Sequence, residues 1–242
     1  MRNILAMAQR ELSAFFYSPI AYVVLFAFTF MVGLLFVFLT ENFSPGSEAS
    51  LRDTFNWLPP LLCVAVPILT MRLLSEEYRS GTIETLMTAP ISDMEVILGK
   101  YLGTLVFYLV MLGATLFYVV LLTFFGRPDF GLLLSGYVGL VLTGSLFVAI
   151  GLFFSSITRN QIIAALLGAF FLLLLTILAW IIVQFADVKG TTRLILQMVS
   201  VMDRFQHFNR GLVDLNNLVF FVGGTAFFLF LAVKVMESRR WR

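Results

Sequence analysis

The sequence predicts an all-α polytopic membrane protein with six transmembrane helices. Of its 242 residues, 60% are apolar and only 12% are charged, about half the charged share of a soluble domain. The apolar residues gather in runs of about 20, the length that crosses the hydrocarbon core as a helix. These runs lack the alternation of β-barrel strands. Lipid is therefore the expected solvent for most of the chain.

Basic residues set the orientation of the six spans, because cytoplasmic ends carry an excess of Lys and Arg. With the N-terminus inside, ten of the 16 Lys and Arg residues are cytoplasmic, and four of the others lie in one segment, residues 189–210. Both termini are then expected in the cytoplasm. The chain reads as one transmembrane domain over residues 1–242. Its predicted spans are about 20–40, 55–74, 101–125, 130–156, 162–185 and 218–236.

Residues 1–19 are predicted to form an interfacial helix before the first span. Apolar residues recur there at helical spacing from Ile4 to Phe16, and polar residues such as Arg10 fill the other face. Such a helix lies along the membrane surface, although an ordinary anchor without further role would look the same. The stretch lacks the continuous apolar core of a cleavable signal peptide, so we expect the first span to remain in the mature chain.

Small residues spaced four apart predict places where the spans pack closely. In the second span, Pro59 and Pro60 fit the opening turn, whereas Pro67 lies mid-membrane and removes a backbone hydrogen bond. The lone cysteine, Cys63, fits a small buried hydrophobe. The predicted packing residues are Gly99 and Gly103, Ser145 and Ala149, and Ala164 and Gly168.

Residues 187–217, before the last span, are expected on the external side. The segment is too polar to span, yet apolar residues recur in it at helical spacing, which predicts a helix lying in the outer interface or re-entering it. These residues are Leu194, Ile195, Met198, Met202, Phe205 and Phe208.

The cytosolic loop 75–99 is the one long polar interruption in the first half of the chain. Gly81 can adopt a backbone angle that other residues avoid. A short helix follows and ends at Pro90. It could dock into a partner's groove or form a lid on the protein's own surface. Its apolar face comprises Ile83, Leu86 and Met87.

A second helix is predicted to begin after this loop. Ser92 and Glu95 form a capping box, and the helix should continue from about Asp93 into the third span. At 1.5 Å per residue it would extend roughly 50 Å, longer than the hydrocarbon core of about 30 Å. We therefore expect the third helix to protrude into the cytosol. A push on the short helix would then tilt the spans attached to it.

Two stretches resemble ABC-2-type transporter permeases. "SEEYRSGTIETLMTAPISDMEVILGKYLG" resembles the family's E-x(n)-G-T-I-E-x-L-x-T-x-P-I-S-x-x-E loop between the second and third spans. "RFQHFNRGLVDLNNLVFF" is similar to its H-F-x-x-F-x-x-G-x-[IV]-D stretch before the last span, slightly displaced where Phe208 or Asn209 stands for the second Phe. The short chain and the basic ending "ESRRWR" look most like the gliding-motility-associated permease subgroup.

The resemblance implies a permease subunit of an ATP-binding-cassette exporter in the bacterial cytoplasmic (inner) membrane. Family members work in pairs, each docked on an ABC ATP-binding subunit, so the expected partners are that subunit and a second copy or homologous permease, with an accessory extracytoplasmic subunit as a further candidate. We expect no cofactor on this chain and place ATP and Mg²⁺ on the partner, because no G-x(4)-G-K-[ST] loop occurs. Residues 82–89 would be the coupling helix. The implied ATPase contact comprises Glu76, Glu77, Gly81, Thr82, Ile83, Glu84, Leu86, Met87 and Pro90.

Other function classes are disfavoured to different degrees. A catalytic or metal site is not expected, because the spans hold no central ionisable residue and His207 is the only histidine. An ion-coupled secondary transporter usually buries such residues. A non-conducting subunit that transmits force within an ABC complex stays open. A net charge of +2 without a basic, aromatic-rich run argues against a nucleic-acid partner.

Two local alternatives also stay open. Glu76 and Glu77 could be solvated or paired with Arg72 and Arg79, although exposed pairs contribute only about 0–1 kcal/mol. The Phe-rich spans fit a lipidic or amphipathic cargo, but contact with lipid explains them equally well.

Overall fold

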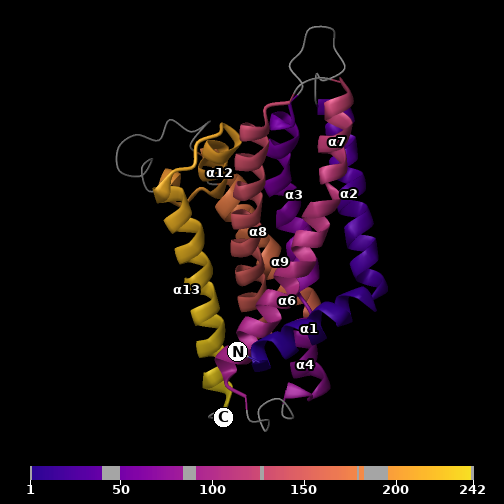
Figure 1. Ribbon diagram of the computed structural model, residues 1–242. Coiled ribbons are helices and arrows are strands. Elements are labelled where there is room, and N and C mark those ends of the chain that lie inside the picture. The colour runs from indigo at the N-terminus through magenta and orange to yellow at the C-terminus, as the bar shows by residue number, and fades with distance from the viewer. Residues whose placement is uncertain are drawn as a thin grey trace.

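The computed structural model describes residues 2–39, 50–83, 91–125, 128–178, 180–182 and 196–240. Over these ranges every regular element is a helix, and six helices are long and apolar enough to cross a membrane. The predicted all-α, six-span fold class is confirmed. The N-terminal helix, α4 and the last turns of α13 lie at the same end of the bundle (Figure 1).

The first, second, fourth and sixth spans are single helices, whereas the third carries a break and the fifth a change of helix type. The elements in chain order are α1 (Arg2–Phe16), α2 (Pro19–Leu39), α3 (Arg52–Thr70), α4 (Ser75–Ser80), α6 (Asp93–Ala114), α7 (Leu116–Phe125), α8 (Phe130–Ile157), α9 (Gln161–Leu173), the π-helical turn η2 (Leu174–Leu178), α12 (Val201–Asn209) and α13 (Leu215–Arg240).

Short polar side chains begin several of these helices by accepting a hydrogen bond from a backbone N–H of the first turn. The predicted capping box is present: Ser92 Oγ accepts from Glu95 N at 3.2 Å, and Glu95 Oε2 accepts from Ser92 N at 3.0 Å. Asp129 begins α8 and Asn160 begins α9 in the same way. The sequence thus fixes where the third, fourth and fifth spans start.

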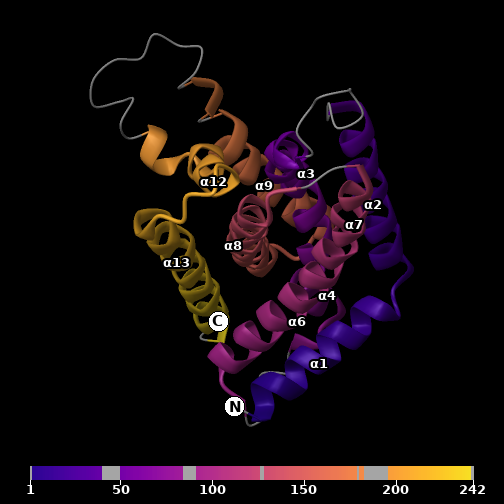
Figure 2. The same ribbon diagram turned by 45° about the horizontal axis from the view of Figure 1, so that its top comes forward.

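α8 occupies the centre of the bundle, with α3, α6, α9, α12 and α13 packed around it (Figures 1 and 2). Three of its glycines, Gly136, Gly144 and Gly151, have no room for a Cβ, because Phe55, Tyr108 and Thr70 fill that space. Tyr108 is fully buried there and donates a hydrogen bond to a carbonyl of α8 at 2.7 Å. Larger residues at these glycines would push the neighbouring helices away.

The predicted packing residues of the later spans lie at contacts between helices. Ser145 hydrogen-bonds with Tyr101 of α6, and Ala149 is fully buried in the middle of α8. Ala164 of α9 is also buried, and a Cβ at Gly168 would lie 3.7 Å from Pro67 of α3.

One local expectation, the placement of Pro59 and Pro60, was wrong. α3 begins at Arg52, before the predicted start, so Pro59 and Pro60 lie inside the helix and not in its opening turn. The helix that begins at Asp93 continues into the third span, as predicted, and a single turn residue, Thr115, separates α6 from α7 within it. The Thr115 side chain donates to the Leu112 carbonyl at 2.6 Å. A threonine hydroxyl that competes for a helix carbonyl in this way favours a bend.

α1 and α12 are helices, as predicted, but their placement at membrane interfaces stays a prediction. Most of the predicted short cytosolic helix, residues 84–89, lies outside the described residues, as do Pro90 and residues 187–195 of the external segment. The ends of the first and fifth predicted spans, residue 40 and residues 183–185, also lie outside them.

Candidate functional site

α4 is a six-residue helix that leads from the second span into the segment with the implied coupling residues. It is fixed to α8 by Ser155, whose hydroxyl accepts hydrogen bonds from Leu74 N at 3.0 Å and Ser75 N at 3.2 Å. The same hydroxyl donates to the Met71 carbonyl at 3.0 Å. The buried hydroxyl of Ser155 thus provides hydrogen-bond partners for backbone N–H and C=O groups between the end of α3 and the start of α4.

Glu77 of α4 takes part in a buried ion network with α6 and α1. The Lys100 ammonium lies 2.8 Å from Glu77 Oε1 and 2.7 Å from Glu11 Oε1, and its side chain is 1% exposed. Arg10, which is mostly exposed, approaches Glu77 at 4.0 Å. A buried ammonium is costly without counter-charges, so Lys100 requires both glutamates beside it. The pairs therefore hold α1, α4 and α6 together at one point.

Tyr78 of α4 contacts the end of the last helix. The Arg239 guanidinium of α13 lies 4.3 Å from the Tyr78 ring centroid, within the range of a cation–π interaction. Arg239 also donates to the Ile157 carbonyl at the end of α8. We call the cluster of Ser155, Glu77, Lys100, Glu11, Tyr78 and Arg239 the α4 junction.

Two glycines of α6 let α1 approach closely enough to complete the α4 junction. A Cβ at Gly99 would lie 2.5 Å from the Met7 Cβ, and a Cβ at Gly103 would lie 2.8 Å from the Ala8 carbonyl oxygen. Farther along α1, Phe15 stacks on Phe107 with ring centroids 4.9 Å apart. The predicted Gly99 and Gly103 pair therefore faces the N-terminal helix, which the sequence did not identify as its neighbour.

The residues implied in the ATPase contact differ in exposure. Glu76, Gly81 and Thr82 are exposed, whereas Glu77 and Ile83 are buried. Gly81 ends α4 with a φ of 76°, the left-handed conformation expected of it. The remaining implied residues, Glu84, Leu86, Met87 and Pro90, lie outside the described residues.

Sequence reasoning missed most of the α4 junction. Within the described part of the chain, no ion pair joins Glu76 or Glu77 to Arg72 or Arg79; Glu77 pairs with Lys100, while Arg72 donates to Ser18 Oγ at 2.7 Å. From the sequence, Lys100 served only as one of the basic residues that set the orientation of the spans. A lysine two turns inside an apolar helix was the available signal, because its burial requires a counter-ion.

At the opposite end of the bundle, α12 packs on α8 and α3. Phe205 and Phe208 are fully buried, and Gly139 leaves space for Phe208. Ser135 donates to the Phe208 carbonyl at 2.7 Å, and Asn209 donates to the Arg52 carbonyl at 2.8 Å. The "RFQHFNRG" stretch thus docks α12 on the central helix.

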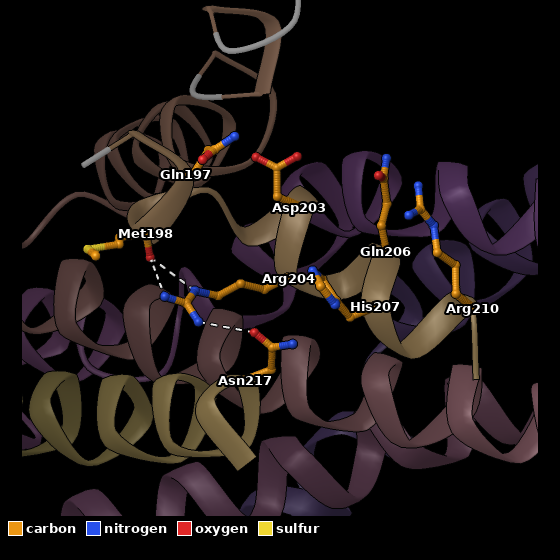
Figure 3. A pocket seen from close by; sticks show the side chains of 8 residues that line it. All are labelled: Gln197, Met198, Asp203, Arg204, Gln206, His207, Arg210 and Asn217. Carbon is orange, nitrogen blue, oxygen red and sulfur yellow. Dashed lines mark hydrogen bonds between the residues drawn. The ribbon is translucent and has the colours of Figure 1, made fainter. Parts of the chain in front are cut away.

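A polar pocket of about 500 Å³ lies beside α12 and the start of α13 (Figure 3). Arg204 donates to the Met198 carbonyl at 2.8 and 3.0 Å and to Asn217 Oδ1 at 3.1 Å, and it lies 4.2 Å from the Phe220 ring centroid. Burial raises the pKa of Asp203 above its usual range, while Ser200 and His207 act in the opposite direction. No cluster of potential metal ligands was found among the described residues. Through its contacts with Asn217 and Phe220, Arg204 links α12 to α13.

A more apolar cavity of about 390 Å³ also lies beside α12, between α3 and the fifth span. Trp57, Trp180 and Met202 contribute apolar surface, and Asn56 and Gln206 contribute amides. The π-helical turn η2 forms part of its wall, through Thr176 and Ile177. Such a cavity suits an apolar group that carries a small polar end.

Comparison with known families agrees with this arrangement. The sequence matches the family described as ABC-2 family transporter protein over residues 5–237, a range that includes α12 and every residue of the α4 junction except Arg239. No similar sequence was found among curated proteins. With six helices able to span a membrane, the chain is a multi-pass membrane protein that belongs to the ABC-2 family of transporter proteins.

Proposed function

We propose that this chain is the permease subunit of an ABC exporter in the bacterial cytoplasmic membrane, with both termini in the cytoplasm. Family membership implies an ATP-binding partner subunit, which would hold ATP and Mg²⁺ and hydrolyse the nucleotide. Two permease chains, identical or homologous, would form the transport pathway. The resemblance to the gliding-motility-associated permeases supports the same subgroup for this chain.

The attachments of α4 carry this proposal. The coupling segment begins one residue after Gly81, and α4 is fastened to α8 through Ser155, to α6 and α1 through Lys100, and to α13 through Arg239. A displacement of the coupling segment would therefore reach four helices at once. This is the behaviour required of an element that converts closure of ATP-binding subunits into alternating access.

The residues of the implied ATPase contact are assigned to two roles in this proposal. Glu76, Gly81 and Thr82, which are exposed, would meet the ATP-binding subunit together with Glu84, Leu86, Met87 and Pro90. Glu77, buried against Lys100, would instead hold α4 to α6. This division assigns Glu77 to transmission of the motion and not to docking.

The cargo we propose is lipidic or amphipathic. The apolar cavity beside α12 has aromatic walls and two amide side chains, a lining that favours a hydrocarbon group with a small polar end. ATP-driven movement of such a cargo in sealed vesicles, without an imposed ion gradient, is the expected result. Movement that follows an ion gradient and ignores ATP would identify a secondary transporter instead.

A charge reversal at Glu84 tests whether the coupling segment docks on the ATP-binding subunit. The permease with Glu84→Lys should be purified in mild detergent from cells that co-express the ATP-binding subunit. We expect that subunit to be absent from the purified complex, because the reversal lies in the coupling segment. Glu237→Lys is the matched control, since it reverses an exposed acid of α13 at the same end and should leave the partner bound. Retention of the partner by both variants would contradict the assignment.

A further inference from the structure

A hollow of about 570 Å³ lies beside the turn between α8 and α9, at the end of the bundle that carries α4. Arg79 of α4 lines one side, and α4 contacts both α8 and α9 at this point. The turn and the start of α9 supply the rest of the lining, which comprises Thr158, Arg159, Asn160, Gln161 and Ile162.

The two arginines of this hollow have no counter-ion among the described residues. Within the described ranges, neither the Arg79 nor the Arg159 guanidinium forms a hydrogen bond or an ion pair, and both residues are exposed. Two other cations at this end are engaged: Lys100 by two glutamates, and Arg239 by the Ile157 carbonyl and the Tyr78 ring. No acidic side chain lines the hollow. Two guanidinium groups therefore line a concave space in which no described residue supplies a negative charge.

The position of the turn places this hollow at the level of lipid headgroups. Only residues 158–160 separate two helices that are long and apolar enough to span. α8 has 28 residues, or about 42 Å at 1.5 Å per residue. This length matches a bilayer of about 40–45 Å that includes both headgroup layers. The polar turn therefore lies where phosphate groups lie.

An apolar strip runs from the hollow along the outside of α9. Ile162, Leu166 and Phe170 are four residues apart and are 68, 64 and 68% exposed. Residues at this spacing share one face of a helix. The surface thus joins a basic hollow at the headgroup level to an uncovered apolar face at the depth of the acyl chains.

We propose that this hollow binds the phosphate group of an anionic phospholipid, with an acyl chain along Ile162, Leu166 and Phe170. Guanidinium groups match phosphate oxygens through paired charge-assisted hydrogen bonds. Basic pockets between spanning helices are a general means of holding anionic headgroups. Because Arg79 belongs to α4, a bound lipid links the α4 junction to α9.

A titration with defined lipids tests this site. The purified permease with its bound partner subunit, in detergent, is titrated with dioleoyl phosphatidylglycerol and with dioleoyl phosphatidylcholine, and bound lipid is counted by native mass spectrometry. Arg79→Gln and Arg159→Gln should each weaken phosphatidylglycerol binding about fivefold, the contribution of one basic residue near an anionic headgroup. Arg2→Gln removes the same charge from an exposed position of α1 at the same end and should leave the affinity unchanged.

Three results would overturn the proposal. Equal weakening by Arg2→Gln would show attraction by diffuse charge in place of a site. Displacement of the lipid by millimolar inorganic phosphate would identify a site for free phosphate. Loss of the ATP-binding subunit from Arg159→Gln, with lipid affinity unchanged, would show that the arginines hold a protein partner. An unchanged melting temperature in each variant establishes that the fold is intact.

Discussion

Replacing Lys100 with Met tests whether the buried ion network holds α1, α4 and α6 together. The substitution keeps a long apolar side chain and removes the ammonium that lies 2.7 Å from Glu11 and 2.8 Å from Glu77. The two carboxylates, whose side chains are 12% and 10% exposed, then face each other without a buried counter-charge. Arg10, at 4.0 Å from Glu77, compensates for only part of the loss.

The expected cost in unfolding free energy follows from this geometry. Removing one partner of a buried ion pair costs about 3–5 kcal/mol. Protonation of the stranded carboxylate sets a ceiling, because neutralising an ordinary glutamate at pH 7 costs about 3.7 kcal/mol. We therefore expect a loss of about 3 kcal/mol for Lys100→Met, which corresponds to a fall in melting temperature of about 6–12 °C for a chain of this size.

Thermal unfolding in detergent measures this effect against a matched substitution. Lys234→Met removes an ammonium from the exposed pair with Glu237 and should cost only about 0–1 kcal/mol. The double variant Lys100→Met with Glu77→Gln should lose less than the sum of its single variants, by at least about 1 kcal/mol, because one stranded charge is gone. Additive losses within about 0.5 kcal/mol, or a Lys100→Met protein as stable as Lys234→Met, would refute the reasoning.

Three further substitutions probe contacts of the α4 junction and of α8, each measured by thermal unfolding. Gly103→Ala places a Cβ 2.8 Å from the Ala8 carbonyl oxygen and should cost about 1–3 kcal/mol, whereas Gly113→Ala on the same helix meets open space and should not destabilise; equal effects would contradict the close approach of α1. Gly144→Ala collides with the Tyr108 ring and should cost about 1–3 kcal/mol, with Gly223→Ala, which has no neighbour within 4 Å, as the control. Arg239→Gln removes the guanidinium from the Tyr78 ring and should cost about 1 kcal/mol, and the same change in a Tyr78→Leu background should cost less; an undiminished cost there would exclude the ring contact.

The sequence was informative about the spans because each depends on a local pattern. Runs of about 20 apolar residues predicted six spanning helices, and the Ser92 and Glu95 pair predicted where α6 begins. Gly81 was identified as the residue able to adopt a positive φ, and it does. These features are set within one helical turn or one continuous run, so no knowledge of tertiary neighbours was required.

The features that the sequence left undetermined depend on which helices become neighbours. A small-residue pair such as Gly99 and Gly103 predicts close packing but does not specify α1 as the helix that packs there. The glycines of α8 accommodate side chains from three helices: Phe55 and Thr70 from α3, Tyr108 from α6 and Phe208 from α12. Lys100 and Glu11 are 89 residues apart, so their pairing could not be read from either segment alone.

The movement of α1 during the ATP cycle is the most direct test of the central claim, that this chain receives motion from an ATP-binding subunit through the α4 junction. Spin labels at Ser13 of α1 and Phe130 at the far end of α8, both exposed, report the distance between the two helices, and Cys63 is too deeply buried to be labelled. We expect the distance between the labels to change when the complex is trapped with ATP and vanadate, and to stay constant in Lys100→Met with the partner still bound. An unchanged distance in the trapped wild-type complex would contradict the account.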